Sequence, residues 1–543
     1  MLQTNGLYED TPLLRDTVSD CMTQNALIYP NRTAFIFDEI EYTWNEADKM
    51  TDHIAVSMLN KNIRKGCHIG FWSLNTVQLV FYLIAAMKIG AVPTVINYSY
   101  RSLELKKIIK KANIEQLFLG EYKKGSDYGG MAEEVRGECP GLKEICHMEK
   151  TSEELRRIYG ERSAVAKAEL SVLLTYKNAV ETDDVIGITF TSGTTKDPKP
   201  VMLSHYNVLN NARQFAARMH VGHEENDVLL APLPLFHSSG MTGMLCFSLV
   251  AGIPTVILRR FTANDALRAI ERYHVTVLMA VPSMLELMAC SYNEEEFDIS
   301  SLRIGQTSGA GISAGKLQRI IETLGFDHFT MAYGQTECSP LITTTLYEDD
   351  WATITGTVGK PLSYVKVRIW DLEKDCELPA GKTGEIQVQG FNTMKGYYHC
   401  EEENRKKYTA DGWLKTTDTG YFDERGYLHF VTRISDIIIR HGENISPMEI
   451  EGVIEQYSDD IIKVKVVGVA EEVVQEEVAC VIQCSLGRID PEDVKSYVKK
   501  ILASYKVPKY VIQVDAFPMT ETGKIDLAAV KRIAQEFAAD EKI

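Results

Sequence analysis

The chain has 543 residues, enough for two to four domains, and its hydrophobic fraction of 45% and charged fraction of 24% are those of an ordinary globular protein. Its formal net charge of −17 argues against nucleic acid or an anionic membrane surface as the main partner. A local basic pocket for an anionic cofactor remains compatible with this charge.

Cysteine usage and the N-terminal residues predict a reduced, cytoplasmic protein. The 11 cysteines are scattered, and they form no CxxC pair or zinc-like set with histidines. The N-terminus, "MLQTNGLYEDTPLLRD", lacks a basic segment followed by an apolar core, so we expect no signal peptide. The long uncharged run at residues 240–258 contains three glycines and Pro254, which predicts a buried helix, a turn and a strand rather than a transmembrane segment.

Helix and strand signals alternate over most of the chain. Three times, an apolar helical stretch precedes a short apolar strand, at residues 79–90 and 91–97, 244–252 and 253–258, and 266–274 and 275–282. The first of these helices is expected to end at Gly90. This alternation predicts an α/β fold with mostly parallel sheets covered by helices.

From about Gly384 the pattern changes to short strands separated by Gly and Asp turns, and residues 423–426, "DERG", predict a hairpin turn. A compact βαβ-like tail follows Arg433. We therefore predict a large N-terminal domain, residues 1–432, and a small lid-sized domain, residues 433–543.

The tail opens with a helix whose start is marked by three residues. Ser446, Pro447 and Glu449 occupy the N-cap, first and third positions, which predicts a capping box. Two strands at 461–470 and 477–484 and a further helix at 491–505 are expected after it.

A turn rich in hydroxyls follows the predicted strand at residues 184–190. Residues 191–199 gather threonines, a serine and a glycine, and Lys199 stands at the end of the turn. Such a turn can offer backbone N–H groups and hydroxyls to phosphate oxygens. It lacks the GxxxxGK[ST] pattern of a Walker loop, and an ordinary polar surface loop is the alternative.

Three further polar segments are candidates for a nucleotide site. In "MAYGQTECSP", residues 331–340, an aromatic ring, a hydroxyl and a carboxylate occur together. Asp418, in "WLKTTDTGYFD", can accept hydrogen bonds from ribose hydroxyls, and Lys524, in "PMTETGKID", follows a glycine near the C-terminus. Each segment alone has an ordinary alternative: a polar loop, a turn aspartate and a solvated lysine.

In their order and spacing these motifs resemble the adenylate-forming superfamily of acyl-CoA synthetases, luciferases and peptide-synthetase adenylation domains. The resemblance covers nearly the whole chain, from "YPNRTAFIFDE" at Tyr29 to about twenty residues beyond Lys524. It implies a large N-terminal domain of helix-covered, mostly parallel sheets with a small β-barrel-like part, and a small, mobile C-terminal α+β domain.

The resemblance also implies roles for single residues. The ATP-binding residues would be Thr191, Ser192, Gly193, Thr194, Thr195, Lys199, Gly309, Ala310, Tyr333, Gly334, Gln335, Thr336, Asp418, Arg433 and Lys524. The acid would lie against His237, Ser308, Gly309, Ala310 and Gly311. CoA would pass His441 and Gly442, the hinge would be Ser435, and the metal ligand would be Glu337. Lys524, Thr336 and His237 would be the catalytic residues.

The implied chemistry accounts for these residue types. A carboxylate attacks the α-phosphate of ATP, and Mg²⁺ and Lys524 offset the repulsion between the two anions. Pyrophosphate departs from the α-phosphate and an acyl-adenylate is formed. A thiol then attacks the acyl carbonyl, and AMP is released. In the family, rotation of the small domain exchanges the groups needed for these two steps.

The sequence departs from the family pattern at four positions near the site. Lys196, Pro200 and Thr432 stand where the family has glycine, and Ser435 stands where the hinge is usually Asp or Lys. Because a glycine adds backbone freedom, its replacement is expected to stiffen the phosphate loop.

The residue after Phe236 bears on the substrate. Peptide-synthetase domains usually have an anchoring Asp there, whereas this chain has His237, which argues against an α-amino acid. Met241 and Met244 favour an apolar slot and hence a fatty or aryl acid, although methionines at this spacing are also ordinary core residues.

The expected partners are a small carboxylic acid, ATP and CoA. Because the chain ends soon after Lys524, no fused carrier domain is expected, which favours free CoA as the acceptor. Two alternatives are a ligase that loads a separate acyl carrier protein and a nucleotide-binding relative without catalysis.

Overall fold

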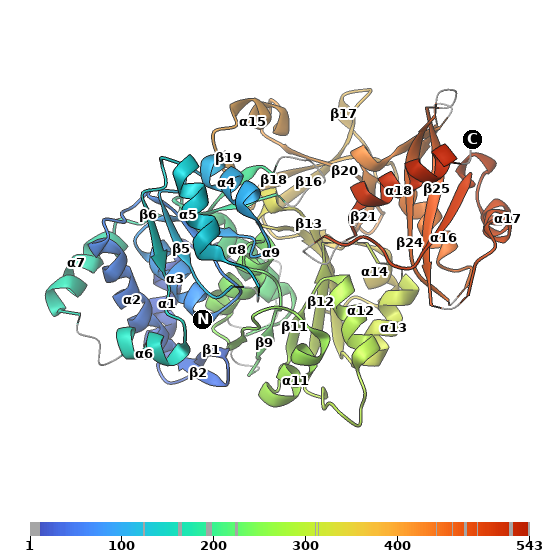
Figure 1. Cartoon of the computed structure of the whole chain (residues 1–543). Helices are drawn as coiled ribbons and strands as arrows, with labels where there is room; N and C mark the ends of the chain where they lie inside the picture. Colours follow the sequence, from blue (N-terminus) through green and yellow to red (C-terminus); the bar gives the residue numbers. More distant parts are fainter. Residues whose placement is uncertain are drawn as a thin grey trace.

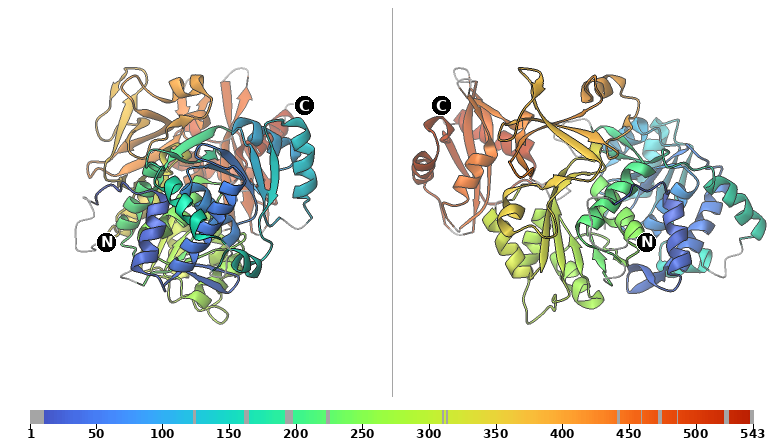
Figure 2. Two further views of the ribbon diagram at one scale, coloured as in Figure 1. Left: turned by 90° about the vertical axis from the view of Figure 1, so that its left-hand side faces the viewer. Right: turned by 180° about the vertical axis from the view of Figure 1, so that it is seen from behind.

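The computed structural model describes residues 11–122, 125–160, 165–191, 198–222, 226–309, 311–312, 314–440, 443–458, 460–471, 475–485, 487–520 and 525–540. Figures 1 and 2 show a large part, coloured blue to orange, and a smaller orange-to-red part at one end of the molecule. Apart from Lys524, the residues predicted to bind ATP and the acid belong to the large part.

The first sheet of the large part is entirely parallel. Its order is β4-β3-β5-β6, with bounds β3 His68–Trp72, β4 Val92–Ile96, β5 Gln116–Leu119 and β6 Glu144–His147. The helix predicted at residues 79–90 is α3 (Val77–Lys88), all of whose residues are buried. Gly90 follows it with a φ of +71°, a conformation that glycine adopts without strain.

The second sheet has nine strands in the order β15-β14-β13-β12-β11-β9-β10-β1-β2. Its bounds are β1 Thr33–Phe37, β2 Ile40–Thr43, β9 Leu229–Leu230, β10 Thr255–Val256, β11 Val277–Met279, β12 Ile304–Ser308, β13 His328–Gly334, β14 Leu341–Thr344 and β15 Lys360–Pro361. The six neighbouring strands β13-β12-β11-β9-β10-β1 pair in parallel. At one edge β2 pairs antiparallel with β1, and at the other β14 and β15 pair antiparallel. The prediction of mostly parallel sheets is therefore confirmed.

Helices cover these sheets, as Figure 1 shows. Besides α3 they are α1 Val18–Ile28, α2 Trp44–Asn60, α4 Ser102–Lys111, α5 Tyr128–Glu138, α6 Ser152–Tyr159, α7 Lys167–Lys177, α8 His205–Arg218, α9 Ser238–Gly240, α10 Phe247–Ala251, α11 Ala263–Tyr273, α12 Pro282–Ser291, α13 Ala314–Leu324 and α14 Trp351–Gly356. The uncharged run at 240–258 forms the π-helix η3 (Met241–Cys246), α10 and β10, as a buried helix, turn and strand. Within the described residues, every helix is too short or too polar to cross a membrane.

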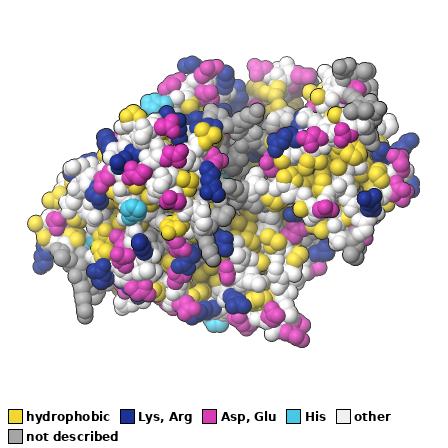
Figure 3. Space-filling model, viewed as in Figure 1, with side chains coloured by type: hydrophobic (Ala, Val, Ile, Leu, Met, Phe, Trp, Pro, Cys, Tyr) yellow, Lys and Arg dark blue, Asp and Glu magenta, His cyan; other side chains and the backbone are white. Residues whose placement is uncertain are grey.

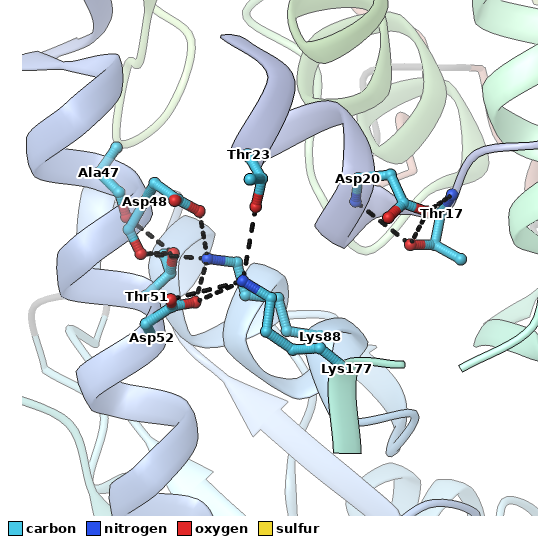
Figure 4. Close-up of polar contacts among 9 residues, drawn as sticks. All are labelled: Thr17, Asp20, Thr23, Ala47, Asp48, Thr51, Asp52, Lys88 and Lys177. Carbon is cyan, nitrogen blue, oxygen red and sulfur yellow. Dashed lines mark hydrogen bonds and ion pairs between the residues drawn. The ribbon is translucent and has the colours of Figure 1, made fainter. Parts of the chain in front are cut away.

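A buried cluster of polar contacts joins four of the helices (Figure 4). The fully buried Nζ of Lys88 lies 2.6 Å from carboxylate oxygens of Asp48 and of Asp52, both on α2. Lys177 of α7 reaches Asp52 at 3.2 Å and donates to Thr23 of α1. Because a buried ammonium is costly without charged partners, this cluster fixes how α1, α2, α3 and α7 pack.

Two antiparallel sheets complete the large part. One has the order β19-β8-β7, with bounds β7 Val185–Phe190, β8 Pro200–Ser204 and β19 Gly396–Tyr397. The other, expected to be barrel-like, is an open sheet of five strands: β16 Val365–Asp371, β17 Cys376–Glu377, β18 Gly384–Gly390, β20 Leu414–Phe422 and β21 Leu428–Arg433. The predicted hairpin joins β20 to β21, and the N–H of Gly426 donates to the carbonyl of Asp423 at 3.0 Å. Helix α15 (Glu401–Lys407) lies between β19 and β20 in the chain.

The C-terminal part is a mixed sheet with three helices. Its strands are β22 Ile438–Arg440, β23 Glu443–Ile445, β24 Ile461–Glu471, β25 Gln475–Cys484 and β26 Tyr510–Val514, and its helices are α16 Pro447–Ile454, α17 Pro491–Ile501 and α18 Leu527–Asp540. Only β25 and β26 pair in parallel among the strand pairs described here. This arrangement confirms the α+β character expected of the tail.

The capping box predicted for α16 is wrong. Ser446 is the N-cap residue and Pro447 begins the helix, but the Ser446 side chain caps no backbone N–H. Its hydroxyl donates instead to the carbonyl of Val431, and Glu449 forms an ion pair with Lys506 at 2.7 Å. Contacts with neighbouring elements outweigh the local capping preference here.

Candidate active site

The carboxyl ends of two neighbouring parallel strands form one wall of the site. Ser308, the last residue of β12, pairs with Ala332 of β13, so Gly309 lies next to the end of β13. Gly334 closes β13, and a Cβ there would stand 1.9 Å from the carbonyl oxygen of Pro340. Only glycine permits this approach of the two backbones. Ligands of open α/β sheets bind at such carboxyl ends.

Tyr333, Asp418 and Arg433 meet beside this wall. Asp418 and Arg433 are opposite each other in the β20–β21 ladder, and Arg433 Nε lies 3.3 Å from Asp418 Oδ1. The hydroxyl of Tyr333 donates to Asp418 Oδ2 at 2.7 Å. Three residues predicted from separate motifs to hold adenine and ribose are thus brought together.

Burial dominates the electrostatics of this group. Asp418 is only 3% exposed, and burial raises the pKa of its carboxyl, while the charge of Arg433 and the hydroxyl of Tyr333 act to lower it. Burial, and next the charge of Asp418, raises the pKa of Tyr333 well above its usual value. Tyr333 therefore serves as a neutral hydrogen-bond donor to Asp418.

The Thr336–Glu337 turn follows β13 as a short 3₁₀ helix, residues Thr336–Cys338. The hydroxyl of Ser238 donates to that of Thr336 at 3.3 Å, which links this turn to the segment after His237 that is predicted to bind the acid. Glu337 is buried, and its Oε1 accepts a hydrogen bond from Tyr397 Oη at 2.7 Å. The turn is thus held from both sides.

Lys407 is a member of the site that the motifs did not reveal. Its Nζ lies 3.7 Å from Glu337 Oε1 and donates to Gln335 Oε1 at 3.3 Å. Gln335, predicted to bind ATP, also carries a buried amide nitrogen, Nε2, that has no hydrogen-bond partner among the described residues. The motifs singled out neither Tyr397 nor Lys407, and "NRKKY" gives no sign that Lys407 turns inward.

The base of the predicted phosphate loop is closed by two hydrogen bonds. The N–H of Thr191 donates to the carbonyl of Lys199, and the N–H of Lys199 donates to Thr191 Oγ1, both at 3.1 Å. Lys199 Nζ lies 5.1 Å from the ring centre of Tyr397, which in turn binds Glu337. The base of the predicted phosphate loop, at Lys199, therefore lies near the Thr336–Glu337 turn. The predicted residues Ser192, Gly193, Thr194 and Thr195, and the departure at Lys196, lie outside the described residues.

The segment predicted to bind the acid starts at His237. Its carbonyl accepts from the N–H of Met241, the first residue of η3, and its ring centre lies 4.5 Å from that of Phe236. π-helical turns occur often at functional sites. Thr242, within η3, donates to the carbonyl of Ser339, so the segment is also tied to the turn after Glu337.

A small cavity is lined in part by Phe236, the residue before His237 in the chain. Its lining comes from β4, β7, β8, α8 and the segment 235–241: Pro93, Val95, Ile186, Gly187, Ile188, Thr189, Leu203, Val208, Leu235, Phe236 and Met241. Apart from Thr189, the side chains that line it are apolar, and none of the described lining residues carries a charge that could pair with an ammonium group.

The remaining predicted residues fall near the C-terminal part. A Cβ on Gly311 would stand 2.9 Å from Cε of Met448 in α16, so the backbone at Gly311, which is predicted to bind the acid, lies close to that part. Ser435 is exposed in the 3₁₀ turn Ile434–Asp436 and donates to Asp436 Oδ1 at 3.0 Å. Ala310, His441, Gly442 and Lys524 lie outside the described residues.

Charge on the face seen in Figure 3 is mixed, with Lys and Arg interspersed among Asp and Glu. This face shows no continuous basic surface of the kind that nucleic acid requires.

Comparisons with known proteins agree with this geometry. The family model described as "AMP-binding enzyme" matches residues 22–398, and "AMP-binding enzyme C-terminal domain" matches residues 449–524. YngI of Bacillus subtilis (strain 168), named as an acyl-CoA synthetase, is 32% identical over 530 residues, covering 94% of this chain and 96% of its own. The mitochondrial medium-chain acyl-CoA ligase ACSF2 of Danio rerio is 29% identical, over 95% and 88% of the two chains.

Solved structures give the same result. The o-succinylbenzoate CoA synthetase MenE from Bacillus subtilis, in complex with its acyl-adenylate intermediate, is 26% identical with a TM-score of 0.79, covering 96% of this chain and 99% of its own. ATP-bound MatB from Rhodopseudomonas palustris is 24% identical, covers 96% and 100%, and with a TM-score of 0.84 shares the fold. Since the first family model spans more than half of the chain, this protein belongs to the AMP-binding enzymes of the adenylate-forming superfamily.

Proposed function

We propose that this enzyme uses ATP to activate an apolar carboxylic acid, fatty or aryl, and transfers the acyl group to the thiol of CoA. It is an AMP-forming acyl-CoA ligase: its family is the AMP-binding enzymes, and its relatives are named as an acyl-CoA synthetase and an acyl-CoA ligase. The observation that carries the proposal is the meeting of Tyr333, Asp418 and Arg433 beside the Thr336–Glu337 turn.

In this proposal the nucleotide lies across the ends of β12 and β13. Tyr333, Gly334 and Gln335 face the base, and Asp418 and Arg433 hold the ribose hydroxyls. Lys199 and the loop that it closes receive the phosphates, since its ammonium lies near Tyr397 on the side of Glu337. Lys524, carried by the C-terminal part, would stabilise the charge that develops when the acid attacks the α-phosphate.

A Mg²⁺ ion fits the residues present if ATP supplies most of its ligands. Among the described residues, no cluster of three or more His, Cys, Asp or Glu could hold a metal. Mg²⁺ usually takes only one or two protein carboxylates together with substrate phosphates and water, so Glu337 alone suffices. When bound, the ion would neutralise phosphate charge.

The acid is proposed to enter past His237 toward the apolar cavity. Phe236 and Met241 line this cavity, and none of its described lining residues is a carboxylate that could anchor an amino group. Ser308, Gly309 and Gly311 would flank the carboxylate end of the acid. The name of the ACSF2 relative, a medium-chain ligase, supports an aliphatic acid.

The second half of the reaction is proposed to follow a rotation of the C-terminal part. The boundary at 432/433 and the hinge at Ser435 are part of this proposal, and so are the CoA contacts of His441 and Gly442. A separate acyl carrier protein remains the alternative acceptor, and a cytoplasmic location remains a prediction.

Two linked assays test the proposal. Acid-dependent exchange of pyrophosphate into ATP should occur with straight-chain or aryl acids and be absent with free α-amino acids. AMP release with the best acid should then require CoA. Exchange without CoA-dependent release would indicate a carrier protein as acceptor, and no exchange with any acid would indicate a nucleotide-binding protein without catalysis.

A further inference from the structure

We propose that Lys407 is a positioning residue that acts through Glu337 and sets how strongly ATP binding depends on Mg²⁺. This inference rests on the proposed function, because it needs a nucleotide at the Thr336–Glu337 turn. It adds a residue that the motif resemblance does not include.

The position of Lys407 sets it apart from its neighbours on α15. The last turn of this helix carries Arg405, Lys406 and Lys407. The Lys406 side chain is 73% exposed and pairs with Glu402 on the same helix, whereas the Lys407 side chain is 11% exposed. Exposed lysines near a helix C-terminus are common, because they complement the helix dipole. A covered lysine that leaves its own helix for a carboxylate on another element needs a different explanation.

The contacts of Lys407 lead directly to the nucleotide site. Its Nζ lies 3.7 Å from Glu337 Oε1 and 3.3 Å from Gln335 Oε1, two residues that follow β13. Its charge also lowers the pKa of Asp418, after burial and the larger effects of Arg433 and Tyr333. Lys407 is therefore electrostatically close both to the expected phosphate end and to the expected ribose end of the nucleotide.

Among the described residues, the hydrogen bond and the ion pair of the Glu337 carboxylate are both made through Oε1. Tyr397 Oη donates to Oε1 at 2.7 Å, and Lys407 approaches the same oxygen. Oε2 is then the oxygen through which this carboxylate would reach a cation. By fixing Oε1, Lys407 and Tyr397 together orient Oε2.

The sign of the effect follows from charge alone. Without Mg²⁺, Lys407 offsets the charge of Glu337, which would otherwise repel the phosphates of ATP. With Mg²⁺, the ammonium repels the ion from the same carboxylate. Lys407 should therefore strengthen the binding of metal-free ATP and weaken the added benefit of Mg²⁺.

The test measures ATP binding to the full-length enzyme by calorimetry, once with Mg²⁺ and once with EDTA. In K407M the Kd for metal-free ATP should rise about tenfold, a coupling of ordinary size for linked sites, while the Kd for Mg-ATP changes much less. The ratio of the two Kd values should thus rise about tenfold. The Mg²⁺ concentration that half-saturates binding should fall.

Three variants separate this role from a structural one. K406M removes a lysine from the same helix turn and should leave the ratio unchanged, and K407R should keep the wild-type ratio because it keeps the charge. In an E337Q background, K407M should no longer change the ratio, since the carboxylate through which it acts is gone. If K407M does not fold, K407Q keeps a polar side chain without the charge and is measured instead.

The outcomes are distinct. An unchanged ratio in K407M or K407Q, with or without a lower melting temperature, would overturn the inference and make Lys407 a structural partner of Glu337. A change of equal size in the E337Q background would also overturn it. If the wild-type enzyme binds ATP in neither buffer, the proposed function itself fails.

Discussion

Replacing Tyr333 by Phe removes one hydroxyl and keeps the ring that is expected to lie against adenine. That hydroxyl donates at 2.7 Å to Asp418, which is 3% exposed. Removing one partner from a buried hydrogen bond to a charged group costs about 1.5–3 kcal/mol. Arg433 remains 3.3 Å from the other carboxylate oxygen, so we expect a loss of stability of about 2 kcal/mol.

The variant should also change the pH dependence of ATP use. Burial already raises the pKa of Asp418, and Arg433 and the Tyr333 hydroxyl oppose this rise. Without the hydroxyl the pKa of Asp418 rises further, because one of the interactions that favour its ionised form is lost. Ribose hydroxyls donate to the ionised carboxylate, so kcat/KM for ATP falls as the pH drops through this pKa. The acidic limb of the profile should move to higher pH in Tyr333→Phe.

The stability contribution of Asp418 has the opposite sign to that of an ordinary paired carboxylate. Its pKa is raised in the folded state, so the folded state holds the proton more tightly than the unfolded chain. Stability from this group is therefore lost as the pH rises from its ordinary value through the folded pKa. The upper edge of this window should also be higher in Tyr333→Phe.

Pyrophosphate exchange at varied ATP concentration and pH measures the KM for ATP and the acidic limb. Urea unfolding measures the loss of stability and its pH dependence. Tyr408→Phe is the matched control, because its hydroxyl donates to the carbonyl of Met394 at 2.8 Å and not to Asp418. The control should keep the acidic limb of the wild type. An identical acidic limb and an unchanged KM for ATP in Tyr333→Phe would refute the assignment of Asp418 to the ribose.

Four further predictions use other parts of the molecule. Lys199→Ala should raise the KM for ATP without changing the preference among acids, and unchanged ATP kinetics would remove Lys199 from the phosphate site. Val208→Ala widens the apolar cavity, so exchange assays over a series of acids should show a shift toward longer chains; a constant profile would place the acyl group elsewhere. Lys88→Met leaves Asp48 without its 2.6 Å partner and should destabilise the protein by about 3–5 kcal/mol in urea unfolding. Lys177→Met should cost less, and equal losses would contradict the central place of Lys88 in the buried cluster of polar contacts. Burial lowers the pKa of His205 to about 4, so the unfolded chain takes up the proton at a higher pH than the folded protein does. The free energy of unfolding should therefore fall by about 3 kcal/mol as the pH drops from about 6.5 to 4. His205→Gln should flatten this slope, and an unaltered slope would assign the acid sensitivity to other groups.

The sequence predicted the framework well where burial alone decides the structure. The run at 79–90 is apolar on all sides, and α3 is buried on all sides. The alternation of helices and apolar strands predicted parallel sheets for the same reason. Where a hydroxyl or carboxylate had several partners within reach, local rules failed: Ser446 binds Val431 and Glu449 binds Lys506, and no capping box forms.

The candidate site was less accessible to sequence reasoning because its residues meet through strand register. Asp418 and Arg433 are opposite each other only because the β20–β21 hairpin has this register, and Tyr333 comes from another sheet. The family resemblance supplied these residues, and their roles stay predictions. Lys407 was missed because no spacing rule distinguishes it from Lys406 on the same short helix.

Two of the departures from the family pattern, Pro200 and Thr432, occupy positions in the fold that do not require glycine. Pro200 is the first residue of β8, a position where a strand accepts proline, and its carbonyl still accepts from the N–H of Tyr398. Thr432 pairs with Thr419 inside the β20–β21 ladder, where a non-glycine residue fits, and its carbonyl accepts from the Thr419 hydroxyl. Neither position needs the backbone freedom of glycine, so neither should restrain the site by itself. Stiffening of the phosphate loop therefore becomes a question about Lys196 alone, and Lys196→Gly is the substitution that should accelerate ATP turnover if loop motion limits it.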